Sequence, residues 1–321
     1  MDSNLTPFSP QEEQEFREAE RQGTLPKEIN RFSDHFLKFL LAAPERKSLL
    51  LDLINTILRL MGYEPLADIE PMDRELSPAI KGGRGLRLDY FGRTSAGKVI
   101  NLEFQKYGGS EFIKRALYCS GTLINRQLTS GKDFDELCQT IFVGLLDFTL
   151  FDWDGWYWDF VLTNVKTGKI LTKDLLIIFV EMKKLESIVS DLRRKAKRGE
   201  MDVLDSTTRL VLWGGYMTNV GVDMMANVAE KDPIFAEVVK VEHDFWGDNR
   251  NRFIQWREEK HQLDALSELR SAERRGKAEG KAEGLVEGKV EVARALLSEH
   301  ASLELIEKVT GLSRDEILSL R

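Results

Sequence analysis

Three oxygen-bearing side chains in one short segment could do chemistry: Asp89, Glu103 and Gln105, of which the two carboxylates could hold a metal ion. Residues 86–105 alternate apolar and polar positions on both sides of a short polar turn, which predicts two strands joined as a hairpin. A turn centred near Ala96 places Asp89 opposite Glu103, where directly paired side chains are about 5 Å apart at Cβ. Carboxylates at that distance repel each other unless a cation lies between them, and oxygen ligands suit Mg²⁺ or Mn²⁺. The pattern predicts a metal-dependent site that acts on phosphate.

A solvated hairpin face is the simpler explanation of the same acidic residues, because such spacing also arises by chance. The charge of the surrounding segment favours a site. Residues 77–118 carry eight basic and three acidic side chains, whereas the whole chain has a net charge of −7. A basic segment in an acidic chain is typical of a phosphate-binding surface. The KGGRG sequence at residues 81–85 adds glycines that let backbone amides approach a phosphate, although it lacks the Gly-Lys-Ser/Thr ending of a P-loop.

The composition excludes several classes of protein. A chain of 321 residues allows one large domain with appendages, or two domains. The polar, acidic N-terminus does not resemble a signal peptide, and no apolar run is long enough to span a membrane, so we expect a cytoplasmic protein without membrane contact. The cysteines and histidines lack metal-ligand spacing, which argues against a zinc site and a disulfide framework.

Helices and strands must position the hairpin. Apolar residues at helical spacing predict helices within residues 32–58 and a further helix within residues 111–128, where Arg115 and Tyr118 flank the packing stripe. Nearly continuous apolar runs farther along the chain predict buried strands. A mixed sheet with helices on its faces is the simplest assembly of these elements.

Glycine recurs every four residues in the charged tail, at Gly276, Gly280, Gly284 and Gly288. Each glycine costs a helix about 1 kcal/mol relative to alanine, and like-charge pairs four residues apart weaken the helix further. This segment is therefore a marginal helix or a linker unless another chain packs on the glycine stripe. We expect a homo-oligomer formed through it.

The order of these motifs resembles the recombination-promoting nuclease (Rpn)/transposase family of PD-(D/E)XK nucleases. The opening helices match at residues 34–58. The hairpin matches at residues 86–105, with glutamine where the superfamily usually has lysine. The Arg-x-x-Tyr helix, the strand at residues 174–182 and the glycine-rich tail follow in the family's order. The resemblance covers most of the chain, and residues 187–256 fit it less clearly.

The resemblance implies an α/β fold with a restriction-endonuclease-like PD-(D/E)XK core, in which a mixed sheet of about four strands is flanked by helices. A helical C-terminal extension follows. The segments that we expect are an N-terminal arm (residues 1–30), the nuclease-like core (31–186), a helical region (187–257), a glycine-repeat helix or linker (258–298) and a small helical hairpin (299–321).

The resemblance also implies site roles. Asp89, Glu103 and Gln105 would be catalytic, with Mg²⁺ or Mn²⁺ bound by Asp89, Glu103 and Asp34. Gln105 takes the position of the lysine that otherwise positions the nucleophile. The side chains expected to contact phosphates of DNA are Arg115, Tyr118, Lys38, Lys106, Arg84 and Arg87.

The function implied is a metal-dependent DNA endonuclease that hydrolyses phosphodiester bonds. Promotion of recombination, a link to mobile elements and phage defence are each compatible with it. Two alternatives stay open: a catalytically weak or inactive relative that binds DNA or a partner through the same surface, and an oligomeric assembly protein. The sequence shows no convincing set of three spaced acidic residues that would indicate a strand-transfer reaction.

Overall fold

The structure is a computed structural model that describes residues 8–78, 84–198, 200 and 205–320. The residues Lys81, Gly82 and Gly83 of the glycine-containing KGGRG loop therefore lie outside the described residues. The chain divides into two compact units, Met1–Gln255 and Trp256–Arg321.

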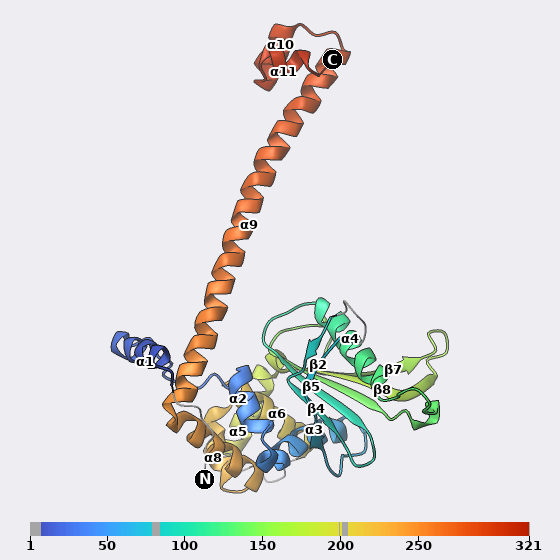
Figure 1. The fold of residues 1–321 in the computed structure, drawn as a ribbon, viewed down its shortest axis with the longest axis vertical. Coiled ribbons are helices and arrows are strands. Elements are labelled where there is room, and N and C mark those ends of the chain that lie inside the picture. The colour runs from blue at the N-terminus through green and yellow to red at the C-terminus, as the bar shows by residue number, and fades with distance from the viewer. Residues whose placement is uncertain (1–7, 79–83, 199, 201–204, 321) are drawn as a thin grey trace. The chain divides into compact units, whose positions relative to one another are not determined.

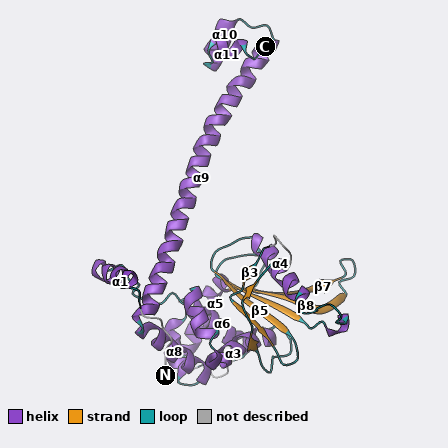
Figure 2. Ribbon diagram, viewed as in Figure 1, coloured by secondary structure: helices purple, strands orange, loops and turns teal. Residues whose placement is uncertain are grey.

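In the first unit, helices precede and follow the strands along the chain, and a further helix divides the strands into two groups (Figures 1 and 2). Its α-helices are α1 (Pro10–Gln22), α2 (Asp34–Leu41), α3 (Lys47–Leu60), α4 (Glu111–Asn125), α5 (Glu186–Lys197), α6 (Ser206–Met217), α7 (Met225–Ala229) and α8 (Pro233–Gly247). Its strands are β1 (Glu70–Pro71), β2 (Glu75–Leu76), β3 (Leu86–Arg87), β4 (Tyr90–Arg93), β5 (Val99–Gln105), β6 (Thr140–Leu146), β7 (Tyr157–Thr163) and β8 (Ile170–Glu181).

A mixed six-stranded sheet forms the centre of this unit, in the order β1-β4-β5-β6-β8-β7. The strands β5, β6 and β8 are parallel, whereas β4 pairs with β5 and β7 with β8 in antiparallel fashion. The expectation of a sheet of about four strands was too low, because β1 and β7 extend it at its two edges. The mixed sheet flanked by helices is the α/β architecture that the sequence predicts.

Opposite faces of the sheet bury different cores. The helix α4 covers one face, where Phe112, Ala116 and Cys119 pack against Val99 and Phe142. Helices α2, α3 and α6 cover the other face. Every residue of β6 is buried because it is a central strand covered on both sides.

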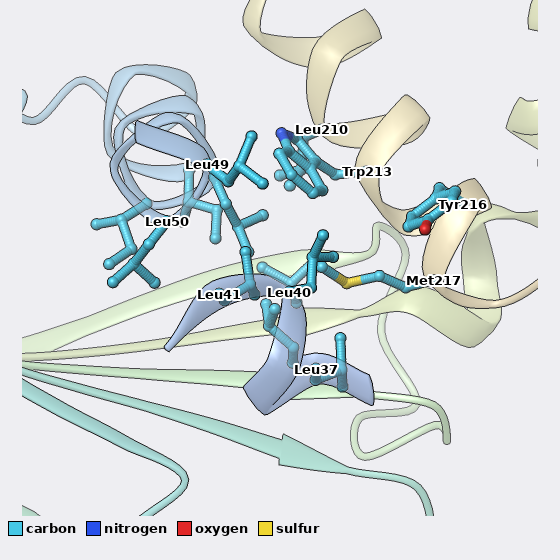
Figure 3. Packing of buried hydrophobic residues seen from close by; sticks show 14 of the residues in the cluster. Leu37, Leu40, Leu41, Leu49, Leu50, Leu210, Trp213, Tyr216 and Met217 are labelled. Carbon is cyan, nitrogen blue, oxygen red and sulfur yellow. The ribbon is translucent and has the colours of Figure 1, made fainter. Parts of the chain in front are cut away.

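The larger core joins helices that are distant in the sequence. Figure 3 shows leucines of α2 and α3 in one cluster with Trp213, Tyr216 and Met217 of α6. The Arg209 guanidinium of α6 also lies 2.9 Å from the Asp52 carboxylate of α3. The region expected as a separate helical segment, residues 187–257, thus contributes residues of α5, α6, α7 and α8 to the same core as the opening helices.

The tail is helical. Helix α9 runs without interruption over Asn249–Ser298, so the glycine-repeat segment is a helix and not a linker. Helices α10 (Leu303–Thr310) and α11 (Arg314–Leu318) form the expected hairpin, in which Gly311 adopts a left-handed φ of 67° and Ser313 begins a capping box with Glu316. Among the described residues, no helix combines the length and the apolar character needed to cross a membrane.

Candidate active site

The hairpin of β4 and β5 places two carboxylates side by side. Tyr90 pairs with Leu102 in the antiparallel register, so Asp89 faces Glu103 at the next position. The backbone N–H of Asp89 donates to Glu103 Oε1 (3.3 Å), and the N–H of Phe104 donates to Asp89 Oδ2 (2.8 Å). Backbone amides therefore fix both carboxylates.

The first strand of the hairpin is shorter than the sequence predicts. The chain leaves the ladder at Leu88 and Asp89, and β3 pairs with β2 in a separate two-stranded sheet. This break gives Asp89 a bend conformation beside the end of β4, where its carboxylate reaches the backbone of β5.

Burial makes this pair difficult to ionise. Glu103 is 1% exposed, and its burial and the neighbouring Asp89 raise its pKa to about 7, although Arg115 acts in the opposite direction. Burial also raises the pKa of half-buried Asp89, against the hydrogen bond from the Phe104 N–H. A bound cation would offset the repulsion between the two carboxylates and favour their ionised forms.

Arg115 approaches the pair from α4. Its Nη2 atom lies 2.7 Å from Glu103 Oε2. The position of Arg115 follows from the helix register, because its neighbours Phe112, Ala116 and Cys119 pack against the sheet and leave it at the edge of the buried face. Burial raises the pKa of the Cys119 thiol, one turn farther on, to about 11, so this cysteine is not a thiolate nucleophile near neutral pH.

A basic cavity of about 610 Å³ opens beside Arg115. Tyr118 forms part of its wall, and its hydroxyl donates to the Arg84 carbonyl (3.0 Å). Four of the lining residues are cationic and one is acidic. The whole lining consists of Arg84, Gly85, Leu86, Arg87, Glu111, Lys114, Arg115 and Tyr118. The structure thus brings four of the predicted DNA-contacting residues together: Arg84, Arg87, Arg115 and Tyr118.

Asp34 and Lys38 lie at the edge of the site. Ser33 caps α2, and Lys38 Nζ pairs with Asp34 Oδ2 at 2.5 Å. Asp34 acts on the acidic pair through its charge, which raises the pKa of Asp89, whereas Lys38 lowers it. Among the described residues, no three acidic, cysteine or histidine side chains are close enough together to hold a metal ion, so Asp34 is near the pair without forming a cluster with it.

Gln105 is the last residue of β5, and Lys106 follows it. Gln105 shares the sheet face of Glu103, and its Nε2 donates to the Tyr107 carbonyl (2.6 Å). Burial raises the pKa of Asp147, and the charge of Lys106 acts in the opposite direction. The charge of Lys106 thus acts on Asp147, whereas that of Arg115 acts on Asp89 and Glu103.

A buried carboxylate that the sequence analysis did not select lies at the end of β8. Glu181 is fully buried and accepts hydrogen bonds from the N–H groups of Leu150 and Phe151 and from Trp158 Nε1. Lys184 Nζ lies 2.8 Å from it. Burial raises the pKa of Glu181, but Lys184 and these donors outweigh that effect and lower it. The signal was an acidic residue at the end of a continuous apolar strand, three residues before a lysine.

A mixed sheet whose antiparallel hairpin sets an aspartate against a Glu-x-Gln strand end defines a class, the PD-(D/E)XK nuclease-like proteins. The chain belongs to the PD-(D/E)XK nuclease family transposases, because the model of that family matches residues 31–272. The resemblance recognised in the sequence is therefore confirmed. No curated protein and no solved structure matches the chain.

Proposed function

We propose that this protein is a metal-dependent endonuclease that hydrolyses phosphodiester bonds of DNA. The observation that supports this most is the pair of fully buried Glu103 and half-buried Asp89 next to a cavity lined by four cationic residues and one acidic residue. Family membership supports the nuclease-like function independently of the geometry. Acidic oxygens for a metal ion and cations for phosphate are the two requirements of such a reaction.

The chemistry of the donors suits a divalent cation. Asp89 and Glu103 offer carboxylate oxygens, which Mg²⁺ and Mn²⁺ prefer. The raised pKa values of both groups reflect repulsion and burial that a cation would offset. These two residues would hold Mg²⁺ or Mn²⁺, with Asp34 as the nearby acid that contributes charge. When bound, such an ion lowers the pKa of a water molecule and stabilises charge on phosphoryl oxygens.

Gln105 has the task of orienting the attacking water. Its Nε2 already donates to the Tyr107 carbonyl, so Oε1 is the atom left to accept a hydrogen bond from water. A neutral amide brings no positive charge, in contrast to the lysine usual in the superfamily. We assign that missing charge to Arg115, which already contacts Glu103. Lys106 is the alternative source.

The DNA phosphates would lie against the remaining cations of the surface. Arg84 and Arg87 line the cavity, and Lys38 pairs with Asp34 at the other edge of the acidic pair. The net charge of −7 makes binding depend on this focused surface, so affinity should fall steeply as salt rises. Such a nuclease, acting in the cytoplasm, would serve recombination, mobile elements or phage defence equally well.

A plasmid-nicking assay tests the proposal. Wild type should nick supercoiled plasmid at low salt with Mg²⁺ or Mn²⁺ and not with EDTA. Glu103→Ala should be inactive with every ion, while Glu64→Gln, an exposed carboxylate, should match wild type. Circular dichroism spectra must show that both variants are folded. Nicking by folded Glu103→Ala at the wild-type rate would refute the assignment.

The Arg115–Glu103 ion pair favours one second candidate, a DNA-binding protein without turnover. An arginine already neutralises the buried carboxylate, so the surface could bind DNA without recruiting a metal ion. This candidate predicts that DNA binding is the same with Mg²⁺ and EDTA, and that isothermal titration of Mn²⁺ gives no heat of binding.

A further inference from the structure

The cavity beside the acidic pair has an aromatic and apolar wall that phosphate binding does not require. Its volume is about 610 Å³, and Tyr118 and Leu86 line it together with the cations. Pockets for small organic ligands measure roughly 300–1,000 Å³. One nucleotide is a ligand of that scale.

Tyr118 is held in place while its ring stays accessible. It is 47% exposed, it projects from α4, and its hydroxyl donates to the Arg84 carbonyl (3.0 Å). The position of the ring is thus fixed at two points: its Cβ is attached to the helix backbone, and its hydroxyl bonds to the chain that leads into β3. A fixed, half-exposed aromatic ring loses little side-chain entropy when a flat ligand stacks on it.

The charges around this ring select an anion. Arg84 and Lys114 are exposed, and neither makes an ion pair with any described residue. The one acidic residue of the lining, Glu111, accepts a hydrogen bond from the N–H of Gly109 (2.9 Å). The cavity therefore joins cations to an aromatic surface, which is the combination that binds single-stranded nucleic acid.

We propose that this cavity binds an unpaired nucleotide of DNA, with its base against Tyr118 and Leu86 and its phosphate at Lys114 and Arg115. The paired bases of a duplex are stacked inside it, so a duplex offers mainly phosphates to such a cavity, whereas a single strand can insert a base. The substrate class is thus DNA with a single-stranded segment. This inference rests on the proposed function for its link to cleavage, but the binding itself is independent of catalysis.

Fluorescence anisotropy with the full-length protein in EDTA measures this binding without cleavage. The probes are labelled (dT)₁₂, its duplex with (dA)₁₂, and an abasic 12-mer of the same charge. We expect (dT)₁₂ to bind at least about tenfold more tightly than the duplex or the abasic strand, since base stacking contributes roughly 1–3 kcal/mol per base.

Variants locate the effect. Tyr118→Ala should weaken (dT)₁₂ binding about 5- to 100-fold and leave duplex binding nearly unchanged. Tyr118→Phe should retain the ring and most of the affinity. Phe134→Ala removes an 85%-exposed aromatic ring that does not line the cavity and should have no effect. Thermal melting checks that each variant is folded.

Equal affinity for (dT)₁₂ and the abasic strand would overturn the inference, because the cavity would then bind phosphate alone. An equal loss for all three probes in Tyr118→Ala would overturn it as well. Absence of plasmid nicking with intact selectivity for (dT)₁₂ would reject the nuclease function and keep the nucleotide site. The two proposals can therefore fail separately.

Discussion

Arg115 and Glu103 form an ion pair that joins α4 to the end of β5, with Nη2 and Oε2 separated by 2.7 Å. The two side chains differ in environment, since Glu103 is 1% exposed and Arg115 is 43% exposed. Water therefore screens the arginine, and the cost of burial falls mainly on the carboxylate. Without a bound metal ion, Arg115 is the described cation that forms an ion pair with Glu103.

Replacement of Arg115 should reduce cleavage more than DNA binding. Arg115→Ala removes the positive charge that we assign to the transition state, so kcat should fall roughly 100-fold, with a smaller change in KM. Arg115→Lys should recover part of the rate. The loss of the arginine also raises the pKa of Glu103 further, which should move the acidic limb of the pH–rate profile to higher pH.

Quantitative nicking assays over a pH series measure both effects. Lys240→Ala, an exposed lysine on α8, is the matched control and should behave as wild type. An unchanged kcat in Arg115→Ala would show that the charge comes from elsewhere, with Lys106→Ala as the next variant to examine.

The buried Glu103 should destabilise the metal-free protein above neutral pH. Its folded-state pKa of about 7 exceeds the ordinary value of 4.5, so the folded state binds more protons than the unfolded state between these values. The penalty grows as pH rises through this window and is complete above pH 7, where it reaches about 3 kcal/mol. Glu103→Gln should therefore be more stable than wild type at pH 8 and similar to it at pH 5.

Urea unfolding of the metal-free proteins at pH 5 and pH 8 measures this difference. Addition of Mg²⁺ or Mn²⁺ should stabilise wild type at pH 8 and have little effect on Glu103→Gln, because binding to the folded state alone raises its stability. If the variant gains the same stability at both pH values, ionisation of Glu103 is not its cause.

Glu181 should be a structural residue. Glu181→Ala leaves several buried donors without an acceptor and removes the partner of Lys184, so we expect a loss of about 3 kcal/mol of unfolding free energy. The lowered pKa of Glu181 means that its contribution is present above the ordinary carboxyl range and is lost as pH falls below it. Glu186→Ala, five residues later and exposed, should change stability little. Urea unfolding at pH 7 measures the unfolding free energy of both variants. Equal stability of the two variants would contradict a structural role for Glu181.

Local patterns predicted the hairpin and its flanking helix well. The alternation through Glu103 and the packing stripe of α4 each depend on short-range periodicity, which the structure reproduces. The opposition of Asp89 and Glu103 followed from turn length alone. The break of the strand at Leu88 could not be predicted, because it depends on pairing between β2 and β3, where the sequence shows no alternation long enough to detect.

The sequence did not predict which distant segments contact each other. The contact of Arg209 with Asp52, and the burial of α6 against α2 and α3, join residues more than 150 positions apart. Periodicity indicates that a helix has an apolar face but not which partner covers it. For the same reason, only the structure shows the four groups that donate hydrogen bonds to Glu181.

The glycine stripe of α9 allows a test of self-association. Apart from the adjacent residues and the backbone of the same helix, no described heavy atom lies within 4 Å of the position that a Cβ would take at Gly276, Gly280, Gly284 or Gly288. Replacing all four by alanine is therefore free of steric conflict inside one chain, and it should stabilise the helix by about 1 kcal/mol per site. If a second copy packs closely on the glycines, the added methyl groups should instead weaken the oligomer.

Multi-angle light scattering and circular dichroism of the full-length protein separate these effects. We expect the four-alanine variant to gain helicity and to dissociate at concentrations where wild type is oligomeric. The control is Glu279→Ala with Glu283→Ala, which removes a like-charge pair four residues apart and so also favours the helix, but leaves the glycines in place. An oligomer that persists in the four-alanine variant, or a wild type that is monomeric throughout, would exclude close packing on the stripe. Exposed Leu285 and Val286 would then contact a different partner or no partner at all.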